Sequence, residues 1–142
     1  MIQSTIEIAT PPDRLLDFPN IPNWHTGFIT SIRSETPEKP LEKDDAISGN
    51  MGGMNFKAKI LECTSEILSW TGPPVLGLFR GIHVFRFEPS KKTDGGTTFT
   101  QEESFKGILA WVFSPYLPLG WLTKRHFDKF GAELKVEAER NG

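Results

Sequence analysis

The sequence of 142 residues contains a single cysteine, Cys63, and a single tyrosine, Tyr116. One cysteine excludes a disulfide within the chain, and without a Cys-x-x-Cys pair a structural zinc site of the usual kind is not expected. The scarcity of tyrosine contrasts with 11 phenylalanines and four tryptophans. Almost every aromatic ring therefore lacks a phenol hydroxyl, which suits an apolar interior.

Neither sign of charge dominates, because the formal net charge is −2. The lysines and arginines are scattered, so the chain lacks the basic patch that nucleic-acid binding requires. An apolar content of 37% excludes disorder, and a charged content of 24% excludes a wholly membrane-embedded chain. The first ten residues lack a basic start followed by an apolar stretch, so no signal peptide and a cytoplasmic location are expected.

Motifs for cofactors are also missing. The glycine-rich segment 49–53 lacks the Gly-Lys-Ser/Thr ending of a phosphate loop, and a hairpin turn explains it. No dinucleotide fingerprint, nucleophile elbow or His-Glu-x-x-His helix occurs. We therefore expect no cofactor and no bound metal.

Alternation of apolar and polar residues predicts strands at residues 2–9, 28–35, 46–50, around 56–60, 67–71, 82–87 and 97–105. Thr10, Pro11, Pro12 and Asp13 can begin a helix, and Pro19 and Pro22 divide the following segment into two short helical pieces. The period changes near the end of the chain. An amphipathic helix is predicted from a four-residue spacing, with Phe127 beside it: Leu122, His126, Phe130, Leu134, Ala138.

The predicted order is one strand, two short helices, six strands and one long helix. It indicates a single α+β domain over residues 1–142, in which a curved seven-stranded antiparallel sheet wraps around the C-terminal helix. Such a sheet either leaves a cavity beneath the helix or is filled by its own side chains.

The chain resembles the START-like, or SRPBCC, superfamily, whose helix-grip fold also occurs in pollen allergens. The similarity is greatest to the polyketide cyclase/dehydrase-like branch. The segments that carry it are 6–12, Trp70-Thr71-Gly72, 81–87, 97–107 and 134–139. The superfamily includes lipid carriers, hormone receptors and polyketide cyclases, so the resemblance implies a helix-grip domain that binds a hydrophobic ligand.

The last two predicted strands place a histidine opposite a glutamate. A hairpin centred near Thr93 pairs Phe87 with Phe99, Phe85 with Gln101, and His83 with Glu103. Residues spaced by two share one face of a strand, so these six and Phe105 lie on the face toward the helix. The opposite face would carry Arg86, Thr98, Thr100 and Glu102 in contact with solvent.

Two interpretations of the His83–Glu103 pair remain open. A carboxylate beside an imidazole fixes its tautomer and suits general acid/base catalysis, with Gln101 as a donor to a carbonyl oxygen of the substrate. The alternative is a buried polar pair that fixes the strand register without turnover. His126 either faces the same interior or is satisfied where the helix meets the sheet. A metal held by His83, Glu103 and His126 is not expected.

The predicted ligand-binding residues are mainly aromatic side chains on inward strand positions and on the last helix. They are Trp24, Phe56, Trp70, Phe85, Phe99, Phe105, Trp111, His126 and Phe130. His25, next to Trp24, is assigned a packing role at the same end.

Residues 107–123 carry no charge and include Trp111, Phe113, Tyr116 and Trp121. The prolines and glycine within them disfavour a membrane span. Three interpretations remain: a flap over the cavity, which is preferred, a membrane-surface contact, or a dimer interface. Residues 73–79 form a second candidate gate.

The sequence therefore predicts a protein that encloses a hydrophobic, aromatic or polyketide-like molecule. If it is an enzyme, the expected reaction is a cofactor-free cyclisation, dehydration or isomerisation, with His83 as the base and Glu103 as its orienter or the acid. One alternative is a non-catalytic carrier of lipids or other hydrophobic ligands. Another is a protein-interaction module that acts through residues 107–123, with a homodimer as one form.

Overall fold

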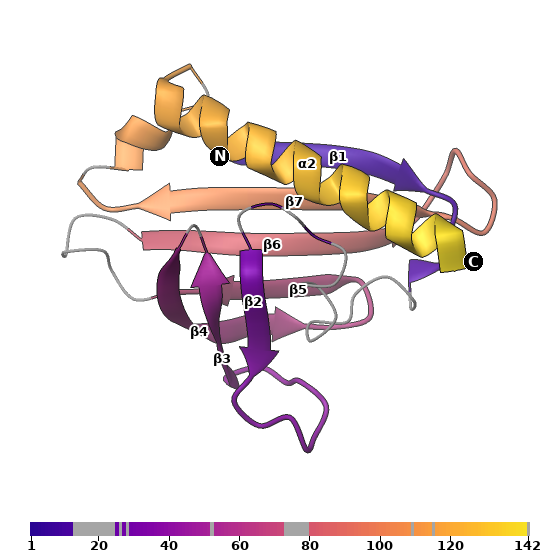
Figure 1. The fold of residues 1–142 in the computed structure, drawn as a ribbon, viewed down its shortest axis with the longest axis horizontal. Helices are drawn as coiled ribbons and strands as arrows, with labels where there is room; N and C mark the ends of the chain where they lie inside the picture. Colours follow the sequence, from indigo (N-terminus) through magenta and orange to yellow (C-terminus); the bar gives the residue numbers. More distant parts are fainter. Residues whose placement is uncertain are drawn as a thin grey trace.

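The computed structural model describes residues 1–12, 25, 27, 29–51, 53–72, 80–108, 110–114 and 116–141. Seven strands of these residues form one antiparallel sheet in the order β1-β7-β6-β5-β4-β3-β2 (Figure 1). Their bounds are β1 Ile2–Ile8, β2 Ile29–Ser34, β3 Ala46–Met51, β4 Met54–Cys63, β5 Ile67–Thr71, β6 Arg80–Pro89 and β7 Thr97–Lys106. The short helix η3 (Ala110–Phe113) and the long helix α2 (Pro118–Asn141) follow.

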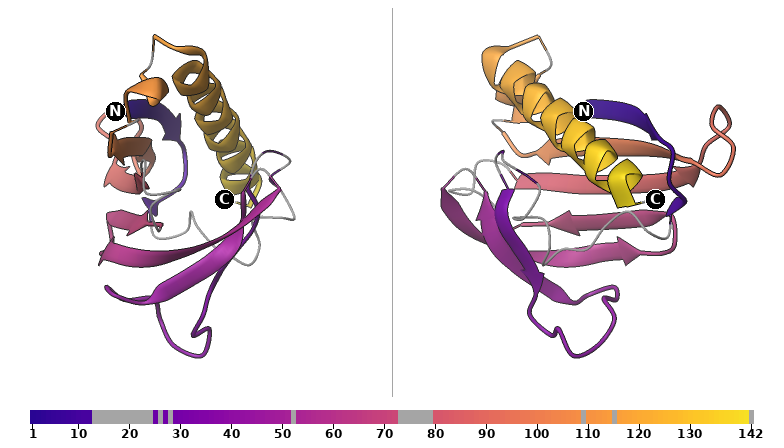
Figure 2. Two further views of the ribbon diagram at one scale, coloured as in Figure 1. Left: turned by 90° about the vertical axis from the view of Figure 1, so that its left-hand side faces the viewer. Right: turned by 45° about the vertical axis from the view of Figure 1, so that its right-hand side comes forward.

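The α+β helix-grip architecture predicted from the sequence is confirmed. The sheet is curved, and α2 runs obliquely along its concave side (Figure 2). The two short helices expected between residues 10 and 24 fall almost entirely outside the described residues. No described helix has the length and apolar character needed to cross a lipid bilayer.

The helix begins one turn earlier than its apolar spacing suggested, with Pro118 in its first turn, where a missing N–H costs nothing. The apolar helix face predicted from the four-residue spacing is correct at Phe130, Leu134 and Ala138, which are buried together with Phe127. Leu122 was wrongly placed on it, because its side chain is 46% exposed. The cause is the oblique path of α2, whose first turns lie beyond the β1 edge of the sheet (Figure 1).

The core fills the space between the concave face of the sheet and α2. Phe85 and Phe99 of the sheet and Phe130 of the helix are almost fully buried. Phe85 and Phe130 stack with ring centroids 5.5 Å apart, and Phe87 stacks on Phe99 at 5.3 Å. Phenyl rings therefore make the central contact between the two layers, as the scarcity of hydroxyls suggested.

The outer face of the β6–β7 hairpin is less exposed than expected. Thr100 is buried, because β1 pairs with β7 and the hydroxyl of Thr5 lies 3.2 Å from that of Thr100. Arg86 and Glu102 form an ion pair at 3.0 Å on the same face. The outer side of these strands is thus a paired polar surface.

Polar contacts fasten the far end of α2 to β1. Lys135 Nζ donates to the Glu7 carbonyl at 2.7 Å, and the Ala9 N–H donates to Glu139 at 2.9 Å. Lys135 also binds the carboxylate of Glu139 at 2.7 Å, and these donors hold the pKa of Glu139 below its usual value. The helix is therefore held by apolar packing along its length and by hydrogen bonds at its end.

Candidate active site

His83 on β6 and Glu103 on β7 lie directly opposite each other, as the register arithmetic predicted. The Nδ1 atom of His83 is hydrogen-bonded to Oε2 of Glu103. The exposed fraction of the side chain is 6% for His83 and 14% for Glu103. The pair therefore lies inside the concave face, largely shielded from water.

Aromatic rings surround the His83 imidazole. Trp70 on β5 stacks on it with centroids 4.6 Å apart and an interplanar angle of 16°. Phe85 and Phe127 contact it nearly edge-on, at 4.9 and 5.1 Å. Three secondary-structure elements, β5, β6 and α2, thus fix the orientation of the ring.

The second ring nitrogen of His83 points away from Glu103 and is buried. Nε2 is buried and makes no hydrogen bond with any described residue. When Glu103 is ionised it can only accept, so Nδ1 carries the proton and Nε2 presents its lone pair. The arrangement provides one oriented hydrogen-bond acceptor in apolar surroundings, which can also take up a proton.

Gly81 makes room for the carboxylate. A Cβ atom on this glycine would lie 2.1 Å from Oε1 of Glu103 and 3.3 Å from its Cδ. Glycine within a strand often marks such a close approach. The sequence interpretation missed this residue, although a glycine inside a predicted strand was a usable signal.

Gln101 lies on the helix-facing side of the sheet, as predicted. Its side chain is 1% exposed, and Nε2 donates to the Phe127 carbonyl at 2.8 Å. Oε1 is buried and has no hydrogen bond within the described part of the chain. Gln101 therefore ties α2 to the sheet beside the His83–Glu103 pair, and its predicted role as a donor to substrate stays a prediction.

The predicted ligand-binding residues separate into two groups. Trp70 and Phe85 contact His83, and Phe99 and Phe130 lie in the next layer. Phe105 is near Gly81, with its ring 3.6 Å from where a Cβ would stand. Phe56 is partly buried at the other side of the core.

Trp111 does not join these residues, because its side chain is 64% exposed on η3. His126 is half-buried on α2, one position before Phe127. Trp24 lies outside the described residues, as do residues 73–79. The ligand-binding roles of all these residues stay predictions.

His25 forms a second histidine–carboxylate contact that the sequence did not indicate. It is 5% exposed, and its Nδ1 lies 3.4 Å from Oε2 of Glu133 on α2. Its ring meets Phe130 edge-on at 4.9 Å. Burial lowers the pKa of His25, and the nearby Glu133 carboxylate only partly offsets this effect. The stacked rings of Phe85 and Phe130 link the two histidine sites.

Two other features lie apart from the pair. A hollow of about 450 Å³ lies beside β2, β3 and β4, lined by Ser31, Arg33, Glu35, Ser48, Gly49, Asn55, Phe56 and Lys57. Burial raises the pKa of the Cys63 thiol, which fits an unreactive cysteine. Within the described residues, no three His, Cys, Asp or Glu side chains gather as metal ligands would.

No family model matches the sequence, and no curated protein matches it. Solved structures do match in three dimensions. A START superfamily protein from Mycobacterium smegmatis has a TM-score of 0.67 and 12% identity, over 99% of this chain and 98% of that one. Norcoclaurine synthase from Thalictrum flavum has a TM-score of 0.65 and 10% identity, over 99% of this chain and 94% of that one.

The di-domain ARO/CYC protein StfQ from the steffimycin biosynthetic pathway has a TM-score of 0.67 and 13% identity. The match covers 99% of this chain and 45% of StfQ. Identities this low show a shared fold and leave the chemistry to the site. The curved sheet closed by one long helix is therefore the helix-grip fold of START-like proteins and polyketide cyclases, as the sequence resemblance implied.

Proposed function

We propose that the protein binds an apolar small molecule against the His83–Glu103 pair and transfers a proton on it without a cofactor. The observation that carries the proposal is the buried Nε2 of His83, which lacks a hydrogen bond to any described residue while Nδ1 is held by Glu103. Buried polar atoms are normally satisfied, so an orphaned one is a marker of a binding or reaction centre. The aromatic rings around it favour a ligand with an apolar, planar body.

The fold supports this class of function without specifying it. The structural neighbours include a START superfamily protein, an ARO/CYC protein of a biosynthetic pathway and a plant synthase. Because one fold hosts many chemistries, the proposal depends on the histidine pair rather than on the likeness.

The proposed reaction begins at a C–H bond next to a ligand carbonyl. Nε2 of His83 takes the proton, and the C–H electron pair moves into the enolate. Glu103 stabilises the imidazolium that forms. Return of the proton to another carbon gives isomerisation, and its delivery to a leaving hydroxyl gives dehydration. No redox partner is required for either outcome.

A carrier without turnover is the second candidate, favoured by the position of Trp70. Its indole stacks on one face of His83, and Phe85 and Phe127 enclose the ring edges. A ring fixed this tightly can serve as a polar anchor that accepts one hydrogen bond from a bound lipid or other apolar alcohol or acid.

The test uses 2-tetralone, an apolar aromatic ketone, as the probe. Exchange of its α-hydrogens in D₂O is followed by NMR with the wild type, His83→Ala, Glu103→Gln and Glu102→Gln. We expect the rate to fall about 100-fold in His83→Ala and about tenfold in Glu103→Gln. Glu102→Gln is the matched control, because Glu102 is the adjacent residue on the outer face and pairs with Arg86.

Native mass spectrometry of freshly purified protein separates the two candidates. A co-purified apolar compound that is lost in His83→Ala, without any 2-tetralone exchange, would assign the carrier role. Equal exchange in all four proteins, with no bound compound, would contradict both candidates and leave the pair a structural one.

A further inference from the structure

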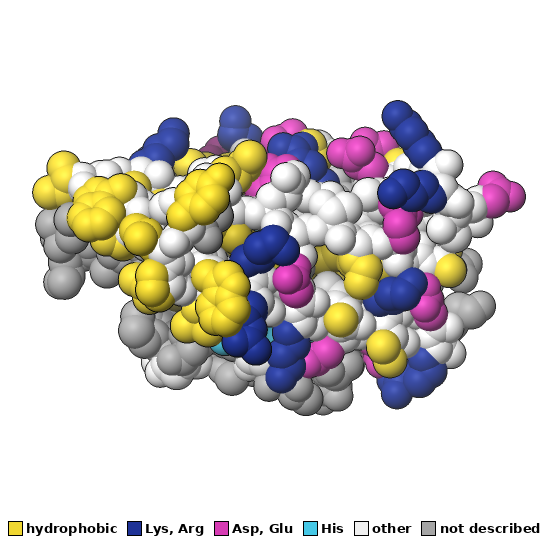
Figure 3. All heavy atoms as spheres, turned by 90° about the horizontal axis from the view of Figure 1, so that it is seen from above, with side chains coloured by type: hydrophobic (Ala, Val, Ile, Leu, Met, Phe, Trp, Pro, Cys, Tyr) yellow, Lys and Arg dark blue, Asp and Glu magenta, His cyan; other side chains and the backbone are white. Residues whose placement is uncertain are grey.

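One end of the molecule exposes an unusual amount of apolar surface. The exposed large hydrophobic side chains between residues 108 and 122 form what we call the aromatic end: Ile108, Trp111, Tyr116, Leu117, Leu119, Trp121 and Leu122. Their exposed fractions range from 36% at Leu117 to 95% at Tyr116. Elsewhere in the described chain, Met1 and Val136 are the only large hydrophobic residues that are exposed. Figure 3 shows apolar side chains gathered at this end of the molecule.

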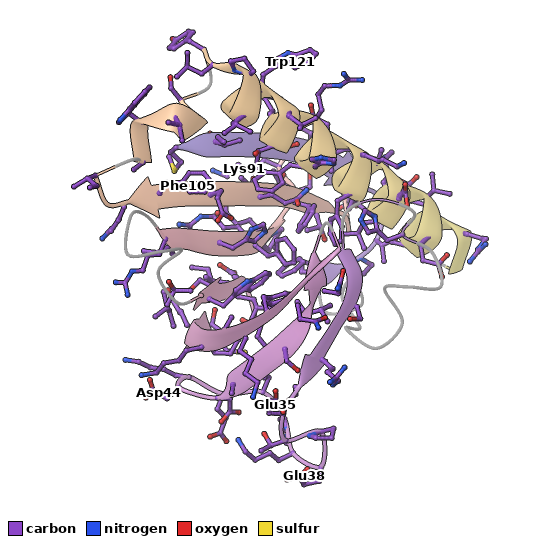
Figure 4. The ribbon with its side chains drawn as sticks, turned by 60° about the vertical axis from the view of Figure 1, so that its left-hand side comes forward. Glu35, Glu38, Asp44, Lys91, Phe105 and Trp121 are labelled. Atoms are coloured by element: carbon purple, nitrogen blue, oxygen red, sulfur yellow. The ribbon has the colours of Figure 1, made fainter. Side chains whose placement is uncertain are left out.

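The exposed side chains come from η3, from the first turns of α2 and from the residues that flank η3, beyond the edge of the sheet. Trp121 lies at the extremity of the molecule, away from the sheet (Figure 4). Isolated exposed apolar residues are normal, whereas contiguous patches mark a surface that meets a partner. The exposed tryptophans do not line the His83 cluster, so this surface is separate from the proposed reaction centre.

Cationic side chains border the aromatic end. The guanidinium of Arg125 lies over the Trp121 ring at 4.9 Å from its centroid. Lys106 ends β7 immediately before this segment, and Arg80 is its register partner on β6. None of these three forms an ion pair with a described carboxylate, and the sequence has no Asp or Glu from residue 104 to 127.

An acidic segment lies far from the aromatic end. Residues 35–45, which connect β2 to β3, contain five acidic side chains and two lysines. Figure 4 places Glu38 and Asp44 far from Trp121. Residues 104–127 thus carry cations without any Asp or Glu, whereas an acidic segment lies far from them.

We infer that the aromatic end docks on an anionic lipid surface. Tryptophan and tyrosine favour the interface between headgroups and acyl chains, and the leucine and isoleucine side chains can enter the hydrocarbon boundary. Arg80, Lys106 and Arg125 would contact the headgroup phosphates, while the acidic connection points away from them. A symmetric second copy fits less well, because an isologous contact would bring the same cations together.

The test measures co-sedimentation of the protein with two kinds of vesicle. One kind is made of phosphatidylcholine alone, and the other contains about 30% phosphatidylglycerol by weight in phosphatidylcholine. We expect binding to the anionic vesicles with a blue shift of tryptophan fluorescence. The affinity of the double variant Trp111→Ser/Trp121→Ser for the anionic vesicles should be lower by a factor of about ten or more. Val136→Ser is the matched control, because Val136 is 67% exposed on the same helix but lies outside the aromatic end. This variant should bind the vesicles as the wild type does.

Two further variants test how much the cationic side chains contribute to vesicle binding. Lys106→Gln and Arg125→Gln should each weaken binding to anionic vesicles about fivefold and reduce its salt dependence. Absence of binding to anionic vesicles, or binding unchanged in the double tryptophan variant, would overturn the inference. A concentration-dependent dimer that the double variant abolishes would assign the surface to a second copy instead. The 2-tetralone assay is independent, since the double variant leaves His83 and Glu103 intact.

Discussion

At the residue scale, the geometry of the His83–Glu103 pair depends on the space left by one glycine. His83 and Glu103 are brought together by strand register, but the carboxylate fits only because Gly81 has no side chain. Phe105, the cross-strand partner of Gly81, has its ring 3.6 Å from the position of the missing Cβ. A binding geometry that depends on a missing Cβ can be altered without touching either polar residue.

Gly81→Ala is therefore expected to displace Glu103 from His83 while the protein stays folded. The new methyl group would collide with the end of a flexible side chain, which can rotate away. Nitrogen-15 NMR of the histidine rings should show loss of the single Nδ1–H tautomer of His83. Gly72→Ala is the control, because its nearest neighbour would be 3.8 Å away. An unchanged His83 signal in Gly81→Ala would refute the proposed steric role.

His25 should make stability depend on pH. Burial lowers its pKa below the reference value of 6.5, so the unfolded chain binds the proton more readily than the folded one. The free energy of unfolding is therefore unaffected by this group above about pH 6.5 and falls as the pH decreases toward the lowered pKa. Glu133 opposes this trend, whereas Lys129 and His126 reinforce it.

Urea denaturation of wild type and His25→Gln at several pH values measures the effect. The variant should lose part of the decrease in stability below pH 6.5. The difference between the two proteins at pH 8 reports the changed packing and the changed contact with Glu133, because His25 is neutral in both states there. If the free energy of unfolding changed with pH in the same way in both proteins, His25 would not titrate as its burial requires.

Some of this site was predictable from the sequence and some was not. Alternation along β6 and β7 and a short connecting turn fix which residues face each other, so His83 and Glu103 followed from counting. The His25–Glu133 contact and the bond from Gln101 to the Phe127 carbonyl join segments far apart in the chain. No local period encodes such contacts, because they arise only when α2 settles on the sheet.

At the element scale, α2 has two functions in two different parts. Its later turns cover the concave face with Phe127, Phe130, Leu134 and Ala138, and its first turns carry the aromatic end. The four-residue spacing predicted the covering part correctly. It could not predict where the helix leaves the sheet, because that depends on the crossing direction rather than on the sequence period.

Phe130→Ala tests the covering part. Phe130 is fully buried and contacts Phe85, Phe99 and His25. Its truncation should lower the free energy of unfolding by about 3–5 kcal/mol, because a cavity replaces a ring between the two layers. Val136→Ala, an exposed position on the same helix, should change it by less than about 0.5 kcal/mol in chemical denaturation. A small loss in Phe130→Ala would mean that the helix is held mainly by its polar contacts.

At the scale of the whole molecule, one helix, α2, connects the proposed binding surface with the proposed reaction centre on β6 and β7. Phe127 touches His83, while Trp121 and Arg125 lie at the aromatic end. A protein held by this end on a lipid surface would present its acidic connection to water. An apolar ligand dissolved in the membrane would then be taken up close to where the protein is anchored.

The order of the strands also determines when the sheet can be completed. β1, the first strand of the chain, has a single neighbour in the sheet, and that neighbour is β7, the last strand. During synthesis Ile2 must therefore wait about a hundred residues for Glu103, its register partner, to leave the ribosome. Such distant pairing slows folding, and α2, the long helix that packs against the concave face, follows later still. We expect the nascent chain to depend on chaperones over this interval, although the finished domain is small.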